Sequence, residues 1–253
     1  MPEFSINDWL AYGLIVLIVL VFVSAYIIAR LKKSSKNPPE EKTIINAILH
    51  RSSERGEGII VGLSDGDGGQ MGSLAGLSGL QSQSHIFKHS LISDIPPKAL
   101  AGDGNLVALS QQLTAGIYRD AVMPELFRME SSVLAGLGAY PYLAGLMPEL
   151  SRPNLNALVL QGELNPELVL ALDLAERRQL QSVVASASLS GQAAAFLATE
   201  HSALGEEAFL SQSNQPRKRA GIEATLLTLR IVRGVLIGGL FLAILLYFLW
   251  VLP

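Results

Sequence analysis

A glycine-rich segment at positions 58–80, GIIVGLSDGDGGQMGSLAGLSGL, has the residue types of a ligand-binding loop. It opens as a short β-branched strand and then becomes small and apolar. A strand, a glycine loop and a helix start can present backbone N–H groups to an anion, whereas alternate carboxylates suit calcium. A plain strand-to-helix turn is the third interpretation. The candidate ligand-binding residues here are Ser64, Asp65, Asp67, Gly69 and Gln70.

Each binding interpretation lacks part of its usual pattern. The DGDGG run has neither the Lys and Ser/Thr of a P-loop nor the spacing of a dinucleotide-binding fingerprint, and its two acids would repel phosphate. It also lacks the third alternate oxygen and the distal Glu of an EF-hand. We therefore expect a plain turn, with a small-molecule or anion site and a cation site as the alternatives. No cofactor and no metal is predicted.

A second segment, VVASASLSGQAAAFLATEHSAL from Val183, shares the plan of the first. It too runs from a β-branched strand through small polar residues to Gly-Gln and a helix of small residues. This similarity would place Gly69-Gln70 and Gly191-Gln192 at matching helix starts. It adds Ser190, Gly191 and Gln192 to the candidate ligand-binding residues.

Other residues that could carry chemistry are few. His85 and His89 are spaced like two metal ligands on one helix face, but no Glu follows the first and Lys88 lies beside them, so we expect two polar surface histidines. No Ser occupies a Gly-x-Ser-x-Gly elbow, and the chain contains no cysteine. We predict no catalytic residue and lean against an enzyme.

Two apolar stretches lie near the ends of the chain. Residues 9–29 and residues 234–253 contain no charged side chain. A helix of about 20 apolar residues spans the roughly 30 Å hydrocarbon core of a bilayer, so we expect two transmembrane helices. Gly234, Gly238 and Gly239 would let the second helix pack closely, against the first helix or against another copy.

Basic residues flank the segment between these two helices. Ten of the 19 Lys and Arg residues lie in the basic linker 30–42 or the juxtamembrane segment 217–233, and none lies in residues 1–8. Lys and Arg near a membrane stay on the cytoplasmic side. We therefore expect a two-pass protein of the plasma membrane. Its N-terminal tail, residues 1–8, and its C-terminus would both lie outside the cell. The basic segments would contact anionic lipid head groups.

The segment between them, residues 43–216, is expected to be a cytoplasmic domain. It has nine Lys and Arg against 17 Asp and Glu, a net charge of −8, which argues against nucleic acid as a partner. Alternating strand and helix patterns favour an α/β, helix-rich domain with short, mainly parallel strands. An all-α domain is the alternative. The expected strands are 59–63, 158–160 and 183–185, and the expected helices are 73–92, 106–122, 166–180 and 191–204. We expect further helix starts at Pro124, Pro148 and Pro166. Residues 93–105 are expected to form a loop.

The last third of the chain resembles a known group of sequences. The run SGQAAAFLATEHSALGEEAFL from Ser190, then a linker and Leu-Arg-x-x-Arg entering an apolar helix, is similar to an uncharacterised family of bacterial membrane proteins with a domain of unknown function. The resemblance implies the bacterial inner membrane, and no activity or catalytic residue.

Two functional hypotheses follow from the sequence. The first is a membrane-anchored assembly or ligand-sensing module without catalytic activity, which associates with itself or with another membrane protein. The alternative is a membrane-bound enzyme or a nucleotide- or anion-binding protein that uses the glycine-rich turn at 64–70.

Overall fold

The computed structural model describes residues 40–66, 73–91 and 93–205, together with positions 233, 234 and 237. Residues 38–212 form one compact unit, distinct from the segments 1–37 and 213–253. None of the helices in the described ranges combines the length and the apolar run that a bilayer span needs. The predicted span 9–29 lies outside the described residues, and so does nearly all of 234–253.

Gly234 is the one predicted helix-packing glycine among the described positions. It is helical and exposed, and no described atom lies within 4 Å of the place where a Cβ would stand. Gly238 and Gly239 lie outside the described residues. The predicted helix contact and the membrane topology therefore stay predictions.

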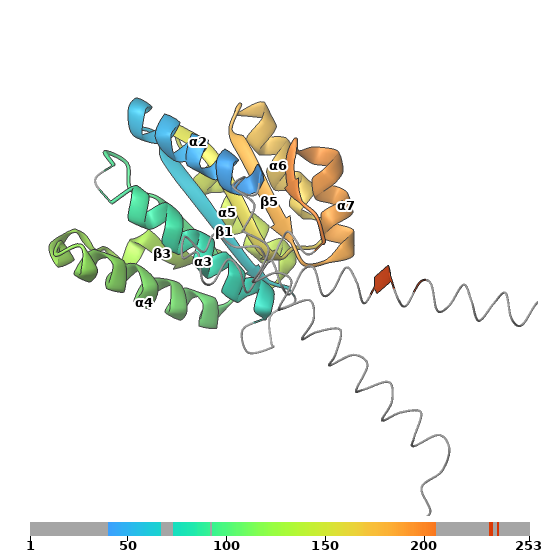
Figure 1. Cartoon of the computed structure of the whole chain (residues 1–253), viewed down its shortest axis with the longest axis horizontal. Coiled ribbons are helices and arrows are strands. Elements are labelled where there is room, and N and C mark those ends of the chain that lie inside the picture. The colour runs from blue at the N-terminus through green and yellow to red at the C-terminus, as the bar shows by residue number, and fades with distance from the viewer. Residues whose placement is uncertain (1–39, 67–72, 92, 206–232, 235–236, 238–253) are drawn as a thin grey trace, which may run out of the picture. The chain divides into compact units, whose positions relative to one another are not determined.

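The described domain contains a parallel six-stranded sheet and six α-helices (Figure 1). The strand order is β3-β2-β1-β4-β5-β6, and every neighbouring pair is parallel. The strands are β1 (Gly58–Asp65), β2 (Lys98–Ala101), β3 (Ser132–Leu134), β4 (Leu155–Glu163), β5 (Gln181–Ser186) and β6 (His201–Ala203). The helices are α2 (Glu40–Arg55), α3 (Leu74–His89), α4 (Gly104–Asp120), α5 (Ala139–Leu150), α6 (Leu168–Arg177) and α7 (Leu189–Ala198), with the 3-10 turns η1 (Pro124–Leu126) and η2 (Met129–Ser131).

The parallel sheet confirms the α/β prediction and excludes an all-α domain. The three predicted strands lie within β1, β4 and β5. Three further strands have too few β-branched residues to be predicted, and β2 lies inside the expected loop 93–105. The helix expected over 191–204 is wrong beyond Ala198. Thr199 ends it, because its Oγ1 donates to the backbone oxygen of Ser182 on β5 at 3.0 Å and turns the chain into β6.

The three Pro-Glu-Leu segments have different structures. Pro124 begins the short turn η1, as predicted. Pro166 precedes the first residue of α6 by two positions. The helix start predicted at Pro148 is wrong, because this proline lies inside α5 near its end. Burial of Leu143, Leu146 and Leu150 against the sheet outweighs the hydrogen bond that a proline removes from a helix.

Helices cover both faces of the sheet. Successive strand residues point to opposite faces: Ile59 and Val61 pack in a core with α2, α3 and α4, whereas Ile60 packs in a second core with α5, α6 and α7. Strand β1 is buried along its whole length, as expected for a central strand that is covered on both sides. The domain is therefore a three-layer arrangement of helices, sheet and helices.

A polar cluster lies inside the first core, where α3, α4 and β3 meet. Gln83 Nε2 donates to Thr114 Oγ1 at 3.0 Å, and Ser110 Oγ donates to Gln83 Oε1 at 2.9 Å. The hydroxyls of Ser110 and Ser132 lie 2.8 Å apart. All four side chains are buried. A buried network of this kind is stable only when its members pair with one another, so it fixes the positions of α3 and α4 against the sheet edge.

Tyr142 of α5 occupies space that two glycines leave open. A Cβ at Gly62 of β1 would overlap the Tyr142 hydroxyl, and a Cβ at Gly102 would lie 3.3 Å from the tyrosine ring. Tyr142 is 3% exposed, and within the described part of the chain its hydroxyl has no hydrogen-bond partner. Burial raises the pKa of Tyr142 well above the usual tyrosine value, because an apolar environment disfavours the charged phenolate.

Candidate functional site

The order in which successive strands join the sheet reverses between β1 and β4. It builds outward from β1 to β2 and β3, and α5 then returns it to β4 on the other side of β1. In sheets of this order, ligands bind in the crevice beyond the carboxyl ends of the two strands at the reversal. Ser64 and Asp65 end β1 there, opposite Gly162 and Glu163 of β4. Two predicted site residues therefore lie at the expected place.

Asp65 connects strand β1 to helix α3. Its carboxylate is buried and accepts the backbone N–H of Ser73, at 2.9 Å to Oδ1 and 3.1 Å to Oδ2. Ser73 is the N-cap of α3, and its Oγ accepts the N–H of Gly76 at 3.0 Å. A carboxylate at a helix N-terminus is stabilised by the exposed N–H groups there. The sequence did not predict this structural role for Asp65.

The ends of β1 and β4 approach each other too closely for a side chain at one position. Gly162 has φ +125°, and a Cβ on it would overlap the backbone oxygen of Ser64. Ser64 is buried, and its Oγ accepts the N–H of Gly66 at 3.4 Å. The N–H of Gly66 also donates to the backbone oxygen of Glu163 at 3.1 Å. Gly66, the described start of the turn after β1, is therefore held by Ser64 and by Glu163 of β4.

Ser186 has the corresponding position at the end of β5. Its buried Oγ donates to the backbone oxygen of Leu164 at 2.8 Å and accepts the N–H of Ser188 at 3.2 Å. Gln192 Nε2 donates to the backbone oxygen of Ser186 at 2.9 Å, and Gln192 Oε1 accepts the N–H of Gly205 at 3.0 Å. Two polar side chains thus hold the turns after β4, β5 and β6 together.

The two similar segments do match in structure, but in a different register from the predicted one. Ser73-Leu74-Ala75-Gly76 begins α3, and Ser188-Leu189-Ser190-Gly191 begins α7. In both, the N-cap serine accepts the N–H of the glycine three residues later, at 3.0 Å and 3.4 Å. Gly191-Gln192 follows its N-cap, whereas Gly69-Gln70 precedes Ser73. The predicted match of the two Gly-Gln pairs at helix starts is therefore wrong.

Of the eight predicted ligand-binding residues, five are described. Ser64 and Asp65 lie at the end of β1, and Ser190, Gly191 and Gln192 lie in the first turn of α7. The end of β4 separates the two groups, because β4 lies between β1 and β5 in the sheet. A Cβ at Gly191 would overlap the backbone oxygen of Leu164, so this glycine allows close packing. Asp67, Gly69 and Gln70 lie outside the described residues.

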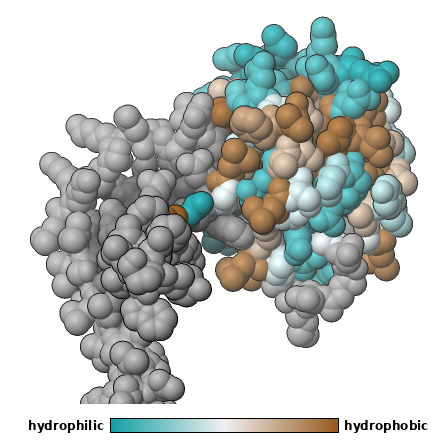
Figure 2. Space-filling model, turned by 90° about the vertical axis from the view of Figure 1, so that its right-hand side faces the viewer, coloured by the Kyte–Doolittle hydropathy of each residue, from teal (hydrophilic) through white to brown (hydrophobic). Residues whose placement is uncertain are grey.

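Helix α7 exposes its large apolar side chains and buries its small ones. Leu189, Phe196 and Leu197 are 84%, 64% and 85% exposed, while Gly191 and Ala195 face the sheet. We call these three exposed residues the α7 face. Figure 2 views the molecule from the side on which α7 lies and shows apolar side chains at the surface among polar ones. Sequence reasoning missed this surface, although the spacing of positions 189, 193, 196 and 197 marks one side of a helix.

The histidine pair differs from its prediction. His89 is exposed, but His85 is buried and its Nε2 lies 2.9 Å from Asn46 Oδ1 of α2. The two rings meet edge to face, with their centres 4.5 Å apart. The prediction of two surface histidines is therefore wrong for His85, because α2 covers this part of α3. The described residues contain no group of three or more side chains that could hold a metal ion.

The chain was compared with family models, curated proteins and solved structures. No family model, no curated protein and no solved structure matches this chain.

Proposed function

We propose that the chain is a membrane-anchored module of the bacterial inner membrane whose cytoplasmic domain assembles with further copies of itself through the α7 face. The anchoring and the orientation rest on the two uncharged spans at 9–29 and 234–253 and on the basic residues beside them. The single observation that carries the assembly is the exposure of Leu189, Phe196 and Leu197 on one helix.

The distribution of side chains on α7 is the reverse of that on an ordinary surface helix. Such a helix turns its large apolar residues to the core and its polar residues to water. In α7 the sheet is contacted by Gly191 and Ala195, while leucine and phenylalanine side chains lie in solvent. A helix that is apolar on all sides is normally covered on all sides. The α7 face is therefore best explained as a surface that another molecule covers.

Charge favours a protein over lipid as the covering molecule. Helices that lie on lipid carry Lys and Arg along their polar side. Residues 189–198 contain no charged side chain, and the next charge along the chain is the acidic Glu200, which anionic head groups would repel. A second copy fits better, because two identical uncharged apolar faces can meet about a two-fold axis without repulsion.

The size of the α7 face indicates a weak contact that depends on the membrane. A stable interface buries roughly 800 Å² on each partner, which is more than three side chains supply. Anchoring in one bilayer raises the effective concentration of the copies, and weak contacts then suffice. We therefore expect assembly in membranes and mild detergent at high protein density, and monomers on dilution.

Cysteine crosslinking of the full-length chain in membranes tests this proposal. The chain has no cysteine, so one introduced thiol reports one contact. Ala193→Cys places a thiol on the exposed side of α7, and the matched control Gln112→Cys places one on exposed α4, on the other face of the sheet. Oxidation should join Ala193→Cys chains into dimers and leave Gln112→Cys chains as monomers. Equal yields at the two positions would refute the proposed interface.

A charge substitution supplies the second test. Leu197→Glu should abolish the crosslink in the Ala193→Cys background, because a carboxylate cannot be buried unpaired between two apolar faces. Met129→Glu, at an exposed position near the opposite sheet edge, is the matched control and should leave the crosslink unchanged. A crosslink that survives Leu197→Glu would count against the α7 face.

The strand order favours a second candidate, a nucleotide- or anion-binding protein that uses the turn at 64–70. Dinucleotide-binding sheets have this strand order and bind at the same reversal between β1 and β4. Free nucleotide at 100 times its dissociation constant would stabilise the domain by about 2.7 kcal/mol. Thermal unfolding of the full chain with millimolar ATP or NAD tests this candidate, and an unchanged unfolding temperature would remove it.

A further inference from the structure

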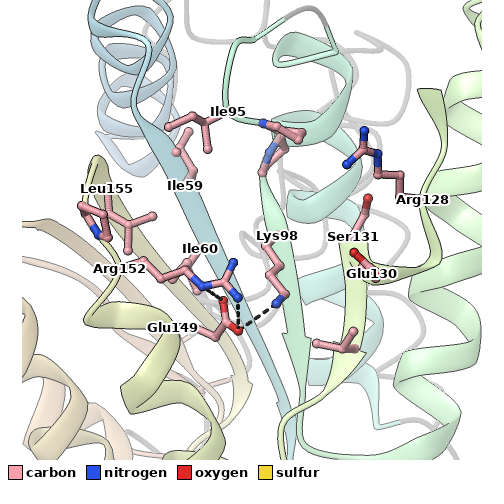
Figure 3. Close-up of a pocket in the computed structure, with 15 residues that line it drawn as sticks. Ile59, Ile60, Ile95, Lys98, Arg128, Glu130, Ser131, Glu149, Arg152 and Leu155 are labelled. Atoms are coloured by element: carbon pink, nitrogen blue, oxygen red, sulfur yellow. Dashed lines mark hydrogen bonds and ion pairs between the residues drawn. The ribbon is translucent and has the colours of Figure 1, made fainter.

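A cavity of about 450 Å³ lies at the amino ends of the strands, the edge opposite the βα turns described above (Figure 3). Gly58 begins β1, Lys98 begins β2 and Leu155 begins β4, and all three line it, as does Val133 of β3. Its volume is within the range of small-molecule sites. None of the ligand-binding residues predicted from the sequence lines this cavity.

Part of the cavity lining is apolar. It consists of Ile95, Pro96 and Pro97 together with Pro153 and Leu155. Figure 3 shows Ile95 and Leu155 on the same side of the opening, beside Ile59. Prolines are rigid and lose little entropy when a ligand packs on them, so these residues offer a preformed surface for a hydrocarbon group.

The floor of the cavity holds one carboxylate between two cations. Lys98 Nζ donates to Glu149 Oε1 at 2.8 Å, and Arg152 Nη2 donates to the same oxygen at 3.0 Å. Arg152 Nε also lies 2.9 Å from Glu149 Oε2, as an ion pair without an aligned hydrogen bond. Only 21% of the Lys98 side chain and 15% of the Glu149 side chain are exposed. One negative charge thus faces two positive ones, and among the described residues the ammonium of Lys98 has N–H groups left for a further acceptor.

The lining also includes a cation that has no ion pair among the described residues. Arg128 and Glu130 both line the cavity, and within the described part of the chain neither forms an ion pair. Figure 3 shows Arg128, Ser131 and Glu130 along one wall, with the Arg128 guanidinium toward the end of the cavity where Ile95 lies and Glu130 nearer to Lys98. With Lys98 and Arg152 the lining carries three basic and two acidic side chains, a net charge of +1. This positive site belongs to a segment, residues 43–216, whose net charge is −8.

We propose that this cavity binds a small carboxylate with an apolar body. The carboxylate would accept hydrogen bonds from Lys98 and, once its exposed side chain turns toward the lysine, from Arg128. The hydrocarbon would lie on Ile95 and the prolines. One negative charge neutralises the excess charge of the lining. The floor already shows the chemistry, because Glu149 is a carboxylate held by a lysine and an arginine. Glu130 would repel a second negative charge, so dicarboxylates and phosphate bind poorly.

Two probes of matched shape and a third without hydrocarbon separate the two halves of this proposal. 4-Methylpentanoate has both the carboxylate and the branched hydrocarbon, 3-methylbutylamine replaces the acid with a cation, and inorganic phosphate has no hydrocarbon. Titration of the full-length chain in mild detergent should show saturable binding of 4-methylpentanoate alone. Binding should weaken as salt rises, because the attraction is between charges. Equal binding of the amine or of phosphate would overturn the proposal.

Arg128→Gln is the decisive variant, because Arg128 is exposed and unpaired among the described residues and its loss should not harm folding. It should weaken binding of 4-methylpentanoate at least about tenfold, the usual effect of removing a hydrogen bond to a charged group. Arg119→Gln, at an exposed arginine in the last turn of α4, is the matched control and should bind as the native chain does. Unchanged affinity in Arg128→Gln would refute the site.

Lys98→Met supplies a second variant, which keeps the aliphatic stem of the lysine and leaves Arg152 to pair with Glu149. It should also lose binding of 4-methylpentanoate. The α7 variant Leu197→Glu should bind normally, because α7 takes no part in this cavity. Ligand binding and assembly can therefore fail separately. Unimpaired binding in Lys98→Met would exclude the lysine from the site.

Discussion

Replacing Tyr142 by phenylalanine should stabilise the domain. The Tyr142 hydroxyl lies in the core between α5 and the sheet, with no hydrogen-bond partner among the described residues. In the unfolded chain the same hydroxyl is hydrated. A buried polar group without a partner costs about 1–3 kcal/mol, and phenylalanine keeps every ring contact. We expect Tyr142→Phe to raise the free energy of unfolding by about 1 kcal/mol, which corresponds to roughly 2–4 °C for a domain of this size.

The neighbouring glycine provides a cycle that isolates the hydroxyl. Gly62→Ala places a methyl group where the Tyr142 hydroxyl lies and should cost about 1–3 kcal/mol through overpacking. In the Tyr142→Phe background the same change should cost less, because one of the overlapping atoms is gone. The rescue is partial, since the side chain of Leu160 also approaches this point. Equal costs in the two backgrounds would show that the two groups are not in contact.

The pH dependence of stability gives an independent readout of the same hydroxyl. Burial raises the pKa of Tyr142 in the folded chain above the usual value of 10.0. Above about pH 10 the unfolded chain therefore releases this proton first, and stability falls as pH rises, by up to about 1.4 kcal/mol per pH unit. Well below pH 10 the hydroxyl is protonated in both the folded and the unfolded chain, so it adds no pH dependence to stability there. Tyr142→Phe should make the alkaline decline shallower, while Tyr118, whose pKa burial also raises, contributes equally in both chains.

Hydrogen exchange of the β1 and β4 amides in the full-length chain measures these energies within the domain. Tyr140→Phe is the matched control, because Tyr140 lies on the same helix but is exposed, and its stability should change by less than about 0.5 kcal/mol. A Tyr142→Phe chain that is less stable than the native one would refute the reasoning, because it would mean that the hydroxyl has a partner in the folded protein.

The remaining predictions concern the site, the core and the membrane segments. Asp65→Asn should lower stability by about 1–2 kcal/mol, because Asp65 loses its charged hydrogen bonds to Ser73, whereas exposed Asp120→Asn should not; urea unfolding checks both. Gln83→Leu should cost about 2 kcal/mol, measured in the same way, because it removes the hydrogen bonds that Gln83 makes to the buried hydroxyls of Ser110 and Thr114. A reporter enzyme fused to the C-terminus should be active only where export is required, and cytoplasmic activity would contradict the predicted topology. Gly234→Ile with Gly238→Ile should weaken association of the full chain in detergent, and unchanged crosslinking would argue against a helix contact there.

The sequence predicts the fold class because the central strands are rich in β-branched residues. Ile59, Ile60 and Val61 of β1 form a continuous apolar run, as strands buried on both faces do. The edge strands do not have this signal: β2 consists of Lys-Ala-Leu-Ala and β6 of His-Ser-Ala. Their conformation comes from pairing with a neighbour that is already in place, which no local pattern shows. The strand order likewise depends on contacts far apart in the chain.

The candidate site was predictable only in part for the same reason. Glycines after a strand correctly locate the end of β1 at the carboxyl edge, beside Gly162 of β4. The partner of Asp65 could not be predicted, because a carboxylate beside glycines suits a ligand, a cation and a helix N-terminus equally well. The cavity at the other edge joins Lys98, Arg128 and Glu149 from three separate segments. No spacing rule connects such residues.

The two edges of the sheet use their polar side chains in opposite ways, and this difference separates stability from binding. At the carboxyl edge, Asp65, Ser186 and Gln192 bond to the backbone of neighbouring turns, so substitutions there should change the free energy of unfolding. At the amino edge, Arg128 forms no ion pair with the described residues, so its substitution should change affinity for a carboxylate while leaving unfolding nearly constant. Scanning both edges with one ligand titration and one unfolding assay would therefore sort the residues into two groups. If substitutions of Asp65, Ser186 or Gln192 also changed affinity for the carboxylate, the domain would bind its ligand at the carboxyl edge instead.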